Sequence, residues 1–173
     1  SVSRGLGDVY KRQHFAALAM KDRGRKDIVA VLGPQDNPAV VDRLRGYRAV
    51  LGEDLPDANV IYTGWNSGDG YQAMHQILAR EIAFDGVLCG SDRIAAGVIT
   101  ALNEAGLSVP ADVSVVGFDD HEIAARCVPA LTTVRQPLRE EGHMAANIAL
   151  DMIKGAEPTT SVMHMQLIQR DSL

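Results

Sequence analysis

Short apolar runs alternate along this chain with longer segments whose apolar positions lie three or four residues apart. The runs are rich in β-branched side chains, which is typical of strands that are buried on both faces. The longer segments have the spacing of helices with one buried side. The pattern predicts strands at residues 28–32, 59–62, 86–89, 113–116, 131–134 and 162–168.

Helices are expected between these strands, and glycines mark several helix ends. Gly24, Gly106 and Gly155 each follow a segment of helical period and suit the left-handed residue that terminates a helix. Leu18 in the first helix and Val41 in the second are expected on the buried side. The predicted helices cover residues 14–23, 39–51, 69–79, 93–105, 122–126 and 137–154.

The alternation of strands and helices predicts an α/β fold, with a parallel sheet flanked by helices and right-handed crossovers. In the last strand the side chains alternate between apolar and polar, which favours a position at the edge of the sheet. Its apolar side consists of Met163, Met165 and Leu167, and its polar side of His164 and Gln166.

The first four predicted strands close on loops rich in glycine and polar residues. Since the carboxyl ends of parallel strands share one edge of the sheet, and ligands bind outside that edge, these loops predict a ligand site. The strand at 113–116, which Gly117 is expected to end, leads to Phe118, Asp119 and Asp120. A carboxylate there suits a polyhydroxylated or amine-bearing small molecule. The alternative is that Asp119 or Asp120 only caps the short helix that follows.

The composition fits one globular domain without a nucleic-acid-binding surface of its own. The chain has 173 residues and a formal net charge of −5, whereas phosphate binding needs clustered Lys and Arg. Cys89 and Cys127 form no spacing motif and are expected to be reduced. No apolar run approaches the roughly 18 residues of a membrane span, so we expect a cytoplasmic protein with no membrane contact. Residues 1–13 have neither helical nor strand period and are expected to be a non-native leader.

Three enzyme or cofactor motifs are suggested by the sequence, and each lacks the spacing it requires. The acidic stretch at 119–122 lies on one turn, and adjacent residues rarely converge on one metal ion. Ser91, His121 and Asp119 lack the Gly-x-Ser-x-Gly turn of a hydrolase triad. The stretch at 64–70 lacks the Lys-Ser/Thr ending of a phosphate loop. We therefore expect a protein that is not an enzyme, with no catalytic residue, metal or cofactor.

Two sequence blocks are more specific than the pattern of strands and helices. They are Val-Pro-Ala-Asp-Val-Ser-Val-Val-Gly-Phe-Asp-Asp at 109–120 and Leu-Thr-Thr-Val-Arg-Gln-Pro at 131–137. With Gly-Ser-Asp at 90–92 and Arg-Asp-Ser at 170–172, they resemble the effector-binding domain of the LacI/GalR family of bacterial transcription regulators. The resemblance covers the chain from about His14 to its end. It implies a periplasmic-binding-protein-like fold of type I, in which two α/β lobes bind an effector between them.

The resemblance also implies that residues 14–173 are a fragment of the effector-binding domain. Residues 24–130 and 155–173 would form the C-terminal lobe, and 131–154 would be a crossover strand and helix of the N-terminal lobe. Family members bind operator DNA as dimers through an upstream headpiece, so a homodimer and operator DNA, bound through the missing headpiece, are expected partners. Without its partner lobe the inward face of the last helix would be exposed. That face consists of Leu138, Ala145, Ile148 and Met152.

The same resemblance places effector contacts on five residues of this chain. Arg43 would supply a guanidinium with several donors, and Trp65 would stack on a ring of the ligand. Asp119 would accept hydrogen bonds, and Ser91 stands where an amide is frequent in the family. Gln136 lies where the chain crosses between lobes and would sense their closure. The structural alternatives are a solvated helix residue for Arg43, loop packing for Trp65, N-capping for Ser91 and a plain linker residue for Gln136.

The expected effector is a small molecule, a sugar rather than a purine or nucleoside. Ala39 stands where some family members have a hydroxyl near the ligand, which removes one contact. An effector in the cleft would shift the arrangement of the lobes and thereby the affinity for the operator. The principal alternative is a periplasmic sugar-binding receptor of a transport system, which shares the fold. The blocks at 109–120 and 131–137 favour the repressor.

Overall fold

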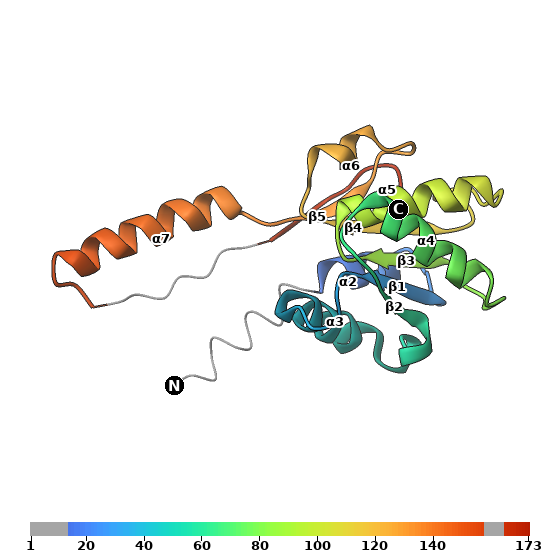
Figure 1. The fold of residues 1–173 in the computed structure, drawn as a ribbon, viewed down its shortest axis with the longest axis horizontal. Coiled ribbons are helices and arrows are strands. Elements are labelled where there is room, and N and C mark those ends of the chain that lie inside the picture. Colours follow the sequence, from blue (N-terminus) through green and yellow to red (C-terminus); the bar gives the residue numbers. More distant parts are fainter. Residues whose placement is uncertain (1–13, 158–164) are drawn as a thin grey trace.

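The computed structural model describes residues 14–157 and 165–173, and their strands form one sheet (Figure 1). The strand order is β2-β1-β3-β4-β5-β6. Neighbouring strands are parallel except at the β6 edge, where β6 runs antiparallel to β5. The predicted α/β class and the edge position of the last strand are therefore confirmed. The strands are β1 (Ile28–Leu32), β2 (Val60–Tyr62), β3 (Gly86–Cys89), β4 (Ser114–Phe118), β5 (Thr132–Arg135) and β6 (Gln166–Ile168).

Helices cover both faces of the sheet, so the fold has three layers (Figure 1). α2 and α3 pack on one face through side chains such as Met20 and Tyr47. α4, α5 and the short α6 pack on the other through side chains such as Met74, Val98 and Ala124. The helices are α2 (Phe15–Asp22), α3 (Pro38–Leu51), α4 (Ser67–Leu78), α5 (Asp92–Glu104), α6 (Glu122–Arg126) and α7 (Leu138–Ile153), with two 3-10 turns, η1 (Gly52–Asp54) and η2 (Asp57–Asn59).

Polar residues beyond the strand ends start the helices. The side chain of Asn37 accepts a hydrogen bond from the Ala39 backbone N–H at 2.9 Å at the start of α3. Asn66 and Asp69 form a reciprocal capping box at the start of α4. The predicted helix-ending glycines are confirmed, since Gly24, Gly106 and Gly155 have φ values of +76°, +79° and +94°.

Two apolar side chains do not lie where their helical spacing predicted. Leu18 and Val41 are exposed, so their prediction as buried residues is wrong. In α2 the buried side consists of small residues and one methionine instead, which lets the helix approach the sheet closely. These residues are Ala16, Ala17, Ala19 and Met20.

The fourth strand is longer than predicted. β4 continues through Gly117 and Phe118, both buried, so the expectation that Gly117 ends the strand is wrong. A Cβ atom at Gly117 would overlap the Asp92 carboxylate and the Leu131 side chain. Gly117 is therefore required by packing inside the strand rather than by a turn after it.

Two glycines bring α4 and α5 into backbone contact. A Cβ atom at Gly97 of α5 would overlap the carbonyl oxygen of Ser67 in α4. A Cβ atom at Gly70 of α4 would overlap the carbonyl oxygen of Ile94 in α5. The two helices therefore pack closely enough that only hydrogen atoms fit at both positions.

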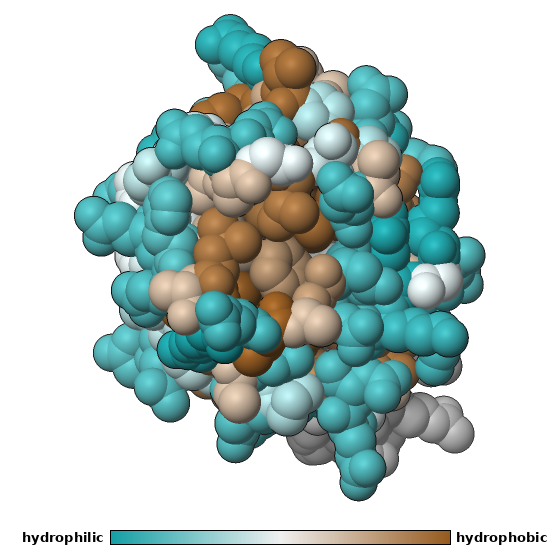
Figure 2. Space-filling view, turned by 90° about the vertical axis from the view of Figure 1, so that its right-hand side faces the viewer, coloured by the Kyte–Doolittle hydropathy of each residue, from teal (hydrophilic) through white to brown (hydrophobic). Residues whose placement is uncertain are grey.

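Helix α7 extends away from the rest of the molecule (Figure 1). None of its residues is buried, and Leu138 and Ile153 are 60% and 82% exposed. Ala145 and Met152 are exposed as well, whereas Ile148 is half-buried, so three of the four residues predicted to form the inward face are exposed in the described part of the chain. At the opposite end of the molecule, Figure 2 shows a hollow where apolar side chains gather within a hydrophilic rim. Among the described residues, no helix combines the length and apolar character needed to cross a membrane.

The C-terminal segment completes the sheet beyond β5. Met165 and Leu167 pack against the core and Gln166 is exposed, which confirms the predicted alternation for the described part of this segment. Met163 and His164 lie outside the described residues. The predicted leader at 1–13 also lies outside them. The Ser172 hydroxyl donates to the Val115 carbonyl oxygen at 2.6 Å and accepts from the Thr132 N–H at 2.8 Å. Ser172 and the C-terminal Leu173 are both buried. β5 thus lies inside the sheet of this lobe, beside β4. The predicted division assigned residues 131–154 to the N-terminal lobe, so a crossing between lobes would begin after Arg135 and not before Leu131.

Candidate functional site

A pocket opens where the carboxyl ends of the parallel strands meet. Its volume is about 250 Å³. It lies at the edge of the sheet where an open α/β fold binds its ligand. Three of the five predicted contact residues line it, namely Trp65, Ser91 and Asp119. The full lining is Trp65, Ser91, Asp92, Arg93, Asp119 and His121.

Asp119 and Gln136 are joined directly. The Gln136 side-chain amide donates a hydrogen bond to the Asp119 carboxylate at 2.7 Å. Gln136 follows β5 and Asp119 follows β4, so the bond links the ends of two adjacent parallel strands. Neither Asp119 nor Asp120 caps α6, because the N-cap is His121, whose Nδ1 accepts from the Ile123 N–H at 3.3 Å. The capping alternative for these aspartates is therefore wrong.

Arg43 lies behind the pocket and is 4% exposed. Its guanidinium donates to the Gly90 carbonyl oxygen at 2.5 Å, and its Cζ lies 3.6 Å from the centre of the Phe118 ring. Burial lowers the pKa of Arg43, while the charges of Tyr47 and Asp119 act in the opposite direction. Its Nε has no hydrogen-bond partner in the described part of the chain. The alternative of a solvated helix arginine is wrong.

Trp65 packs on a loop and Ser91 caps a helix, which are the structural roles predicted as alternatives to ligand binding. The Trp65 ring lies against the backbone of Gly33, where a Cβ atom would overlap it. The ring remains 38% exposed at the pocket, so one part packs on the loop and another is available to a ligand. Ser91 caps α5, because its hydroxyl accepts from the Ile94 N–H at 3.3 Å.

Sequence reasoning missed Asp92, the most buried polar residue of the pocket. Its side chain accepts a hydrogen bond from the Thr133 hydroxyl at 2.5 Å and another from the His121 N–H at 2.6 Å. Burial raises the pKa of Asp92 to about 6, against the effect of these two hydrogen bonds. From the local sequence, Asp92 is an ordinary acidic residue in the first turn of a helix. Only its tertiary contact with Thr133 of β5 shows its role.

A second missed group is the ion-pair cluster formed by Asp120, Arg135 and Arg170. Arg135 and Arg170 each approach one oxygen of the Asp120 carboxylate at 2.6 Å. Burial acts to raise the pKa of Asp120, but the hydrogen bonds and charges of Arg170 and Arg135 outweigh it and hold that pKa below its ordinary value. The cluster ties the end of β4 to β5 and to the C-terminal segment. Arg170 is 50 residues from Asp120, so sequence spacing could not have paired them.

The buried Asp92 predicts a particular pH dependence of stability. Its pKa is about 6 in the folded protein against an ordinary value of 3.8, so the folded state binds the proton more tightly. The stability it contributes is present below pH 4 and is lost as pH rises through 6. The loss amounts to about 3 kcal/mol, since one pKa unit corresponds to about 1.4 kcal/mol. We expect urea denaturation at pH 4 to 7 to show this decline in the wild type relative to Asp92→Asn; a constant difference between the two would contradict it.

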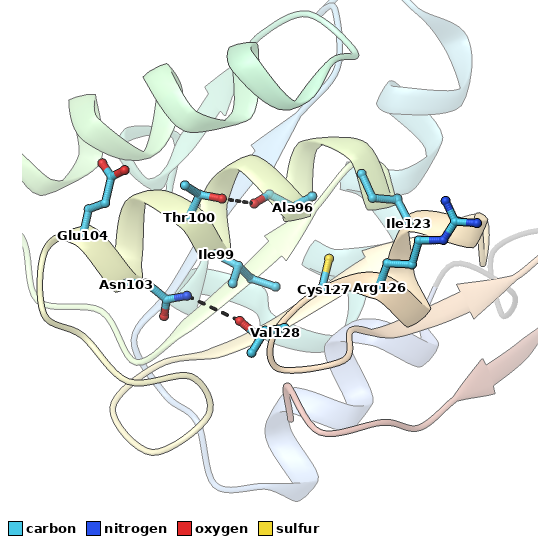
Figure 3. Close-up of a pocket in the computed structure, with 9 residues that line it drawn as sticks. All are labelled: Ala96, Ile99, Thr100, Asn103, Glu104, Ile123, Arg126, Cys127 and Val128. Atoms are coloured by element: carbon cyan, nitrogen blue, oxygen red, sulfur yellow. Dashed lines mark hydrogen bonds between the residues drawn. The ribbon is translucent and has the colours of Figure 1, made fainter.

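A larger pocket lies between α5 and α6, away from the strand ends. It has a volume of about 420 Å³, and apolar residues such as Ile99 and Val128 line it together with the polar or charged Thr100, Asn103, Glu104 and Arg126 (Figure 3). The polar groups there are partly engaged, as in the hydrogen bond from the Asn103 amide to the Val128 carbonyl oxygen at 3.4 Å. None of the five predicted contact residues lines this pocket. Among the described residues, no cluster of three His, Cys, Asp or Glu side chains could hold a metal ion.

A doubly flanked parallel sheet with charged, aromatic and hydroxyl side chains gathered at its carboxyl edge is the arrangement of a small-molecule-binding α/β domain. The chain belongs to the periplasmic binding protein-like domain family, whose model matches residues 17–173. Its relatives place it among the effector-binding domains of the LacI/GalR regulators.

Three similar proteins illustrate the relationship. The HTH-type transcriptional repressor PurR of Escherichia fergusonii is 35% identical over 97% of this chain and 51% of that repressor. A structure of the transcriptional regulator CelR in complex with cellobiose is 33% identical, with a TM-score of 0.87 over 95% of this chain and 52% of that one. A structure of the lac repressor dimer bound to operator and the anti-inducer ONPF is 26% identical, with a TM-score of 0.87 over 95% of this chain and 58% of that one. The chain thus spans about half the length of the curated repressors it matches.

Proposed function

We propose that this chain is the effector-sensing part of a DNA-binding transcriptional repressor. The observation that carries the proposal is the pocket at the carboxyl edge of the sheet, where Asp119, Ser91 and Trp65 meet in a chain whose relatives are repressors. Those relatives also support a repressor over the alternative of a periplasmic sugar receptor for transport. Because they are regulators, they further support a protein without catalytic activity, located in the cytoplasm.

The proposed effector is a small polyhydroxylated molecule, a sugar in preference to a purine or nucleoside. The Asp119 carboxylate accepts hydrogen bonds from two neighbouring hydroxyls, and the exposed part of Trp65 stacks on the less polar face of a sugar ring. Gln136 is already bound to Asp119, so it reorients to share that carboxylate with the ligand. Arg43 supports the site from behind through Gly90 and Phe118, and its Nε, which has no partner among the described residues, is a further donor. A relative has been solved with cellobiose, which is consistent with a sugar.

The proposed mechanism is a shift between two arrangements of a homodimer. An effector that bridges Asp119 in this lobe and groups of a second lobe stabilises one relative position of the lobes. That position sets the spacing of the DNA-binding headpieces of the longer protein and so its affinity for operator DNA. α7 and the crossover after Arg135 are the elements through which this lobe would join the other one.

The test is a ligand titration of the full-length protein. We expect D-glucose or cellobiose to give saturable heat by calorimetry and to change the affinity for operator DNA in a band-shift assay, whereas adenine and adenosine give no heat. If only adenine or adenosine binds, the proposed role as a regulator stands, but the proposal that the effector is a sugar is overturned. Binding of none of the four together with no affinity for DNA would contradict the proposed function.

A further inference from the structure

Asp92 joins three segments of the lobe beneath the pocket. It is the first residue of α5, three residues after the end of β3, and it is 1% exposed. One carboxylate oxygen accepts a hydrogen bond from the Thr133 hydroxyl of β5, and the other from the backbone N–H of His121. A single buried carboxylate therefore connects α5, β5 and the turn at residues 119–121.

The turn at 119–121 presents three successive backbone N–H groups, and each has an acceptor. Asp119 donates to the Val134 carbonyl oxygen at 2.8 Å. Asp120 donates to the Thr133 hydroxyl oxygen at 3.3 Å, and His121 donates to Asp92. Because the Thr133 hydroxyl gives its own proton to Asp92, its oxygen lone pairs are free for the Asp120 N–H. Asp92 thus maintains two of the three bonds, one directly and one through Thr133.

The turn needs this support because its backbone is strained. Asp119 and Asp120 have φ values of +102° and +53°, in the region that non-glycine residues rarely adopt. Such a conformation persists only where the surrounding structure fixes it. The direction in which the Asp119 carboxylate meets a ligand therefore depends on the acceptors below the turn.

We propose that Asp92 is a positioning residue of the effector site, whose ionised carboxylate fixes the turn that carries Asp119, and that uptake of a proton by Asp92 weakens effector binding. The inference rests on the proposed function and adds how the site is held and regulated. A protonated Asp92 becomes a donor, so its hydroxyl competes with the Asp120 N–H for the Thr133 oxygen. The turn then loses one of its two links to Asp92.

The protonation lies in an accessible pH range, because burial raises the pKa of Asp92 to about 6. His121, whose backbone N–H donates to Asp92, is an adjacent titratable residue. The other titratable or charged groups around Asp92 are Cys89 of β3, Arg93 of α5, Asp119 and Asp120 of the turn, Cys127 after α6, and Arg135 and Arg170, which pair with Asp120, with Arg43 behind the pocket.

The test uses Asp92→Asn, Thr133→Val and Thr133→Ser in the full-length protein, titrated with D-glucose, cellobiose, adenine and adenosine from pH 5 to 8. For whichever compound binds the wild type, we expect Asp92→Asn and Thr133→Val to weaken binding about three- to tenfold at pH 7.5, the net effect of one hydrogen bond. Thr133→Ser keeps the hydroxyl and is expected to bind like the wild type. Wild-type affinity is expected to fall as pH drops through 6, and Asp92→Asn is expected to lack that fall.

Each outcome bears on one claim. Asp92→Asn is expected to melt at a temperature no lower than the wild type at pH 7.5, so weaker binding would not reflect unfolding. If Asp92→Asn binds like the wild type, or keeps the same pH profile, the inference is overturned while the proposed function stands. If no compound binds the wild type and the wild type has no affinity for DNA, the proposed function fails. If no compound binds but DNA is bound, crystal structures of the wild type and of Asp92→Asn at pH 7.5 decide the positioning role alone. If Asp119 and Asp120 keep their φ values in the Asp92→Asn structure, the positioning role of Asp92 is overturned.

Discussion

Replacing Gly97 with alanine is expected to destabilise the lobe by about 3 kcal/mol or more, a large part of the stability of a domain of this size. The new methyl group would overlap the Ser67 carbonyl oxygen, which belongs to the backbone of α4 and cannot move aside like a side chain. The helices would have to separate, and the contacts between α4 and α5 would be lost. Urea denaturation followed by circular dichroism at pH 7.5 measures the loss.

The matched control is Gly142→Ala in α7. This glycine also lies inside a helix, but among the described residues a Cβ atom there meets no atom of another element within 4 Å. The control is expected to raise helix stability slightly, because alanine favours a helix over glycine by roughly 1 kcal/mol. Equal effects of the two substitutions would show that helix propensity, and not the contact between α4 and α5, determines the response at Gly97.

Replacing Asp119 with asparagine is expected to weaken effector binding roughly tenfold to 150-fold, because hydrogen bonds to a charged group contribute about 1.5–3 kcal/mol. Asparagine retains an oxygen that can accept the Gln136 amide, so the link between β4 and β5 survives. What is lost is the negative charge and one of the two acceptors offered to ligand hydroxyls. Calorimetric titration of the full-length variant with the compound that binds the wild type measures the change.

Asp151→Asn is the control for Asp119→Asn. Asp151 lies in α7 and forms an exposed ion pair with Lys154 at 3.8 Å, the kind of contact that contributes little to stability. This control removes the same charge from the chain without touching the pocket, and its affinity should match the wild type. Unchanged effector binding by Asp119→Asn would refute the role assigned to that carboxylate.

Most of the fold was predictable because the local pattern and the tertiary structure agree. In β1 and β3 every residue is buried, so an unbroken apolar run marked each strand correctly. The errors occurred where packing overrides the pattern. Gly117 resembled a strand end, but it lies within β4, and glycine is required there because Asp92 lies against it. Leu18 matched the helical spacing, yet alanines and a methionine form the buried side of α2.

The candidate site was predictable only in its outward-facing part. Trp65, Ser91 and Asp119 lie within three residues of the carboxyl ends of their strands, so the shared edge of a parallel sheet brought them together. Asp92 and Thr133, which hold the turn from below, are 41 residues apart and belong to different strand–helix units. No local pattern encodes that pairing. The ion pair of Asp120 and Arg170 could not be predicted either, because the two residues are 50 positions apart in the sequence.

The position of residues 165–173 has a consequence for how the protein is made. Synthesis on the ribosome proceeds from the N-terminus, so β1 to β5 emerge well before the segment that binds their exposed edge. Until Ser172 and Leu173 have been added, the backbone groups of Thr132 and Val115 lack the Ser172 hydroxyl, and Asp120 lacks Arg170. The open side of β5 is meanwhile an unpaired strand edge, the feature most prone to join other chains. Nascent chains that stall before this segment are therefore expected to be substrates for chaperones that shield strand edges.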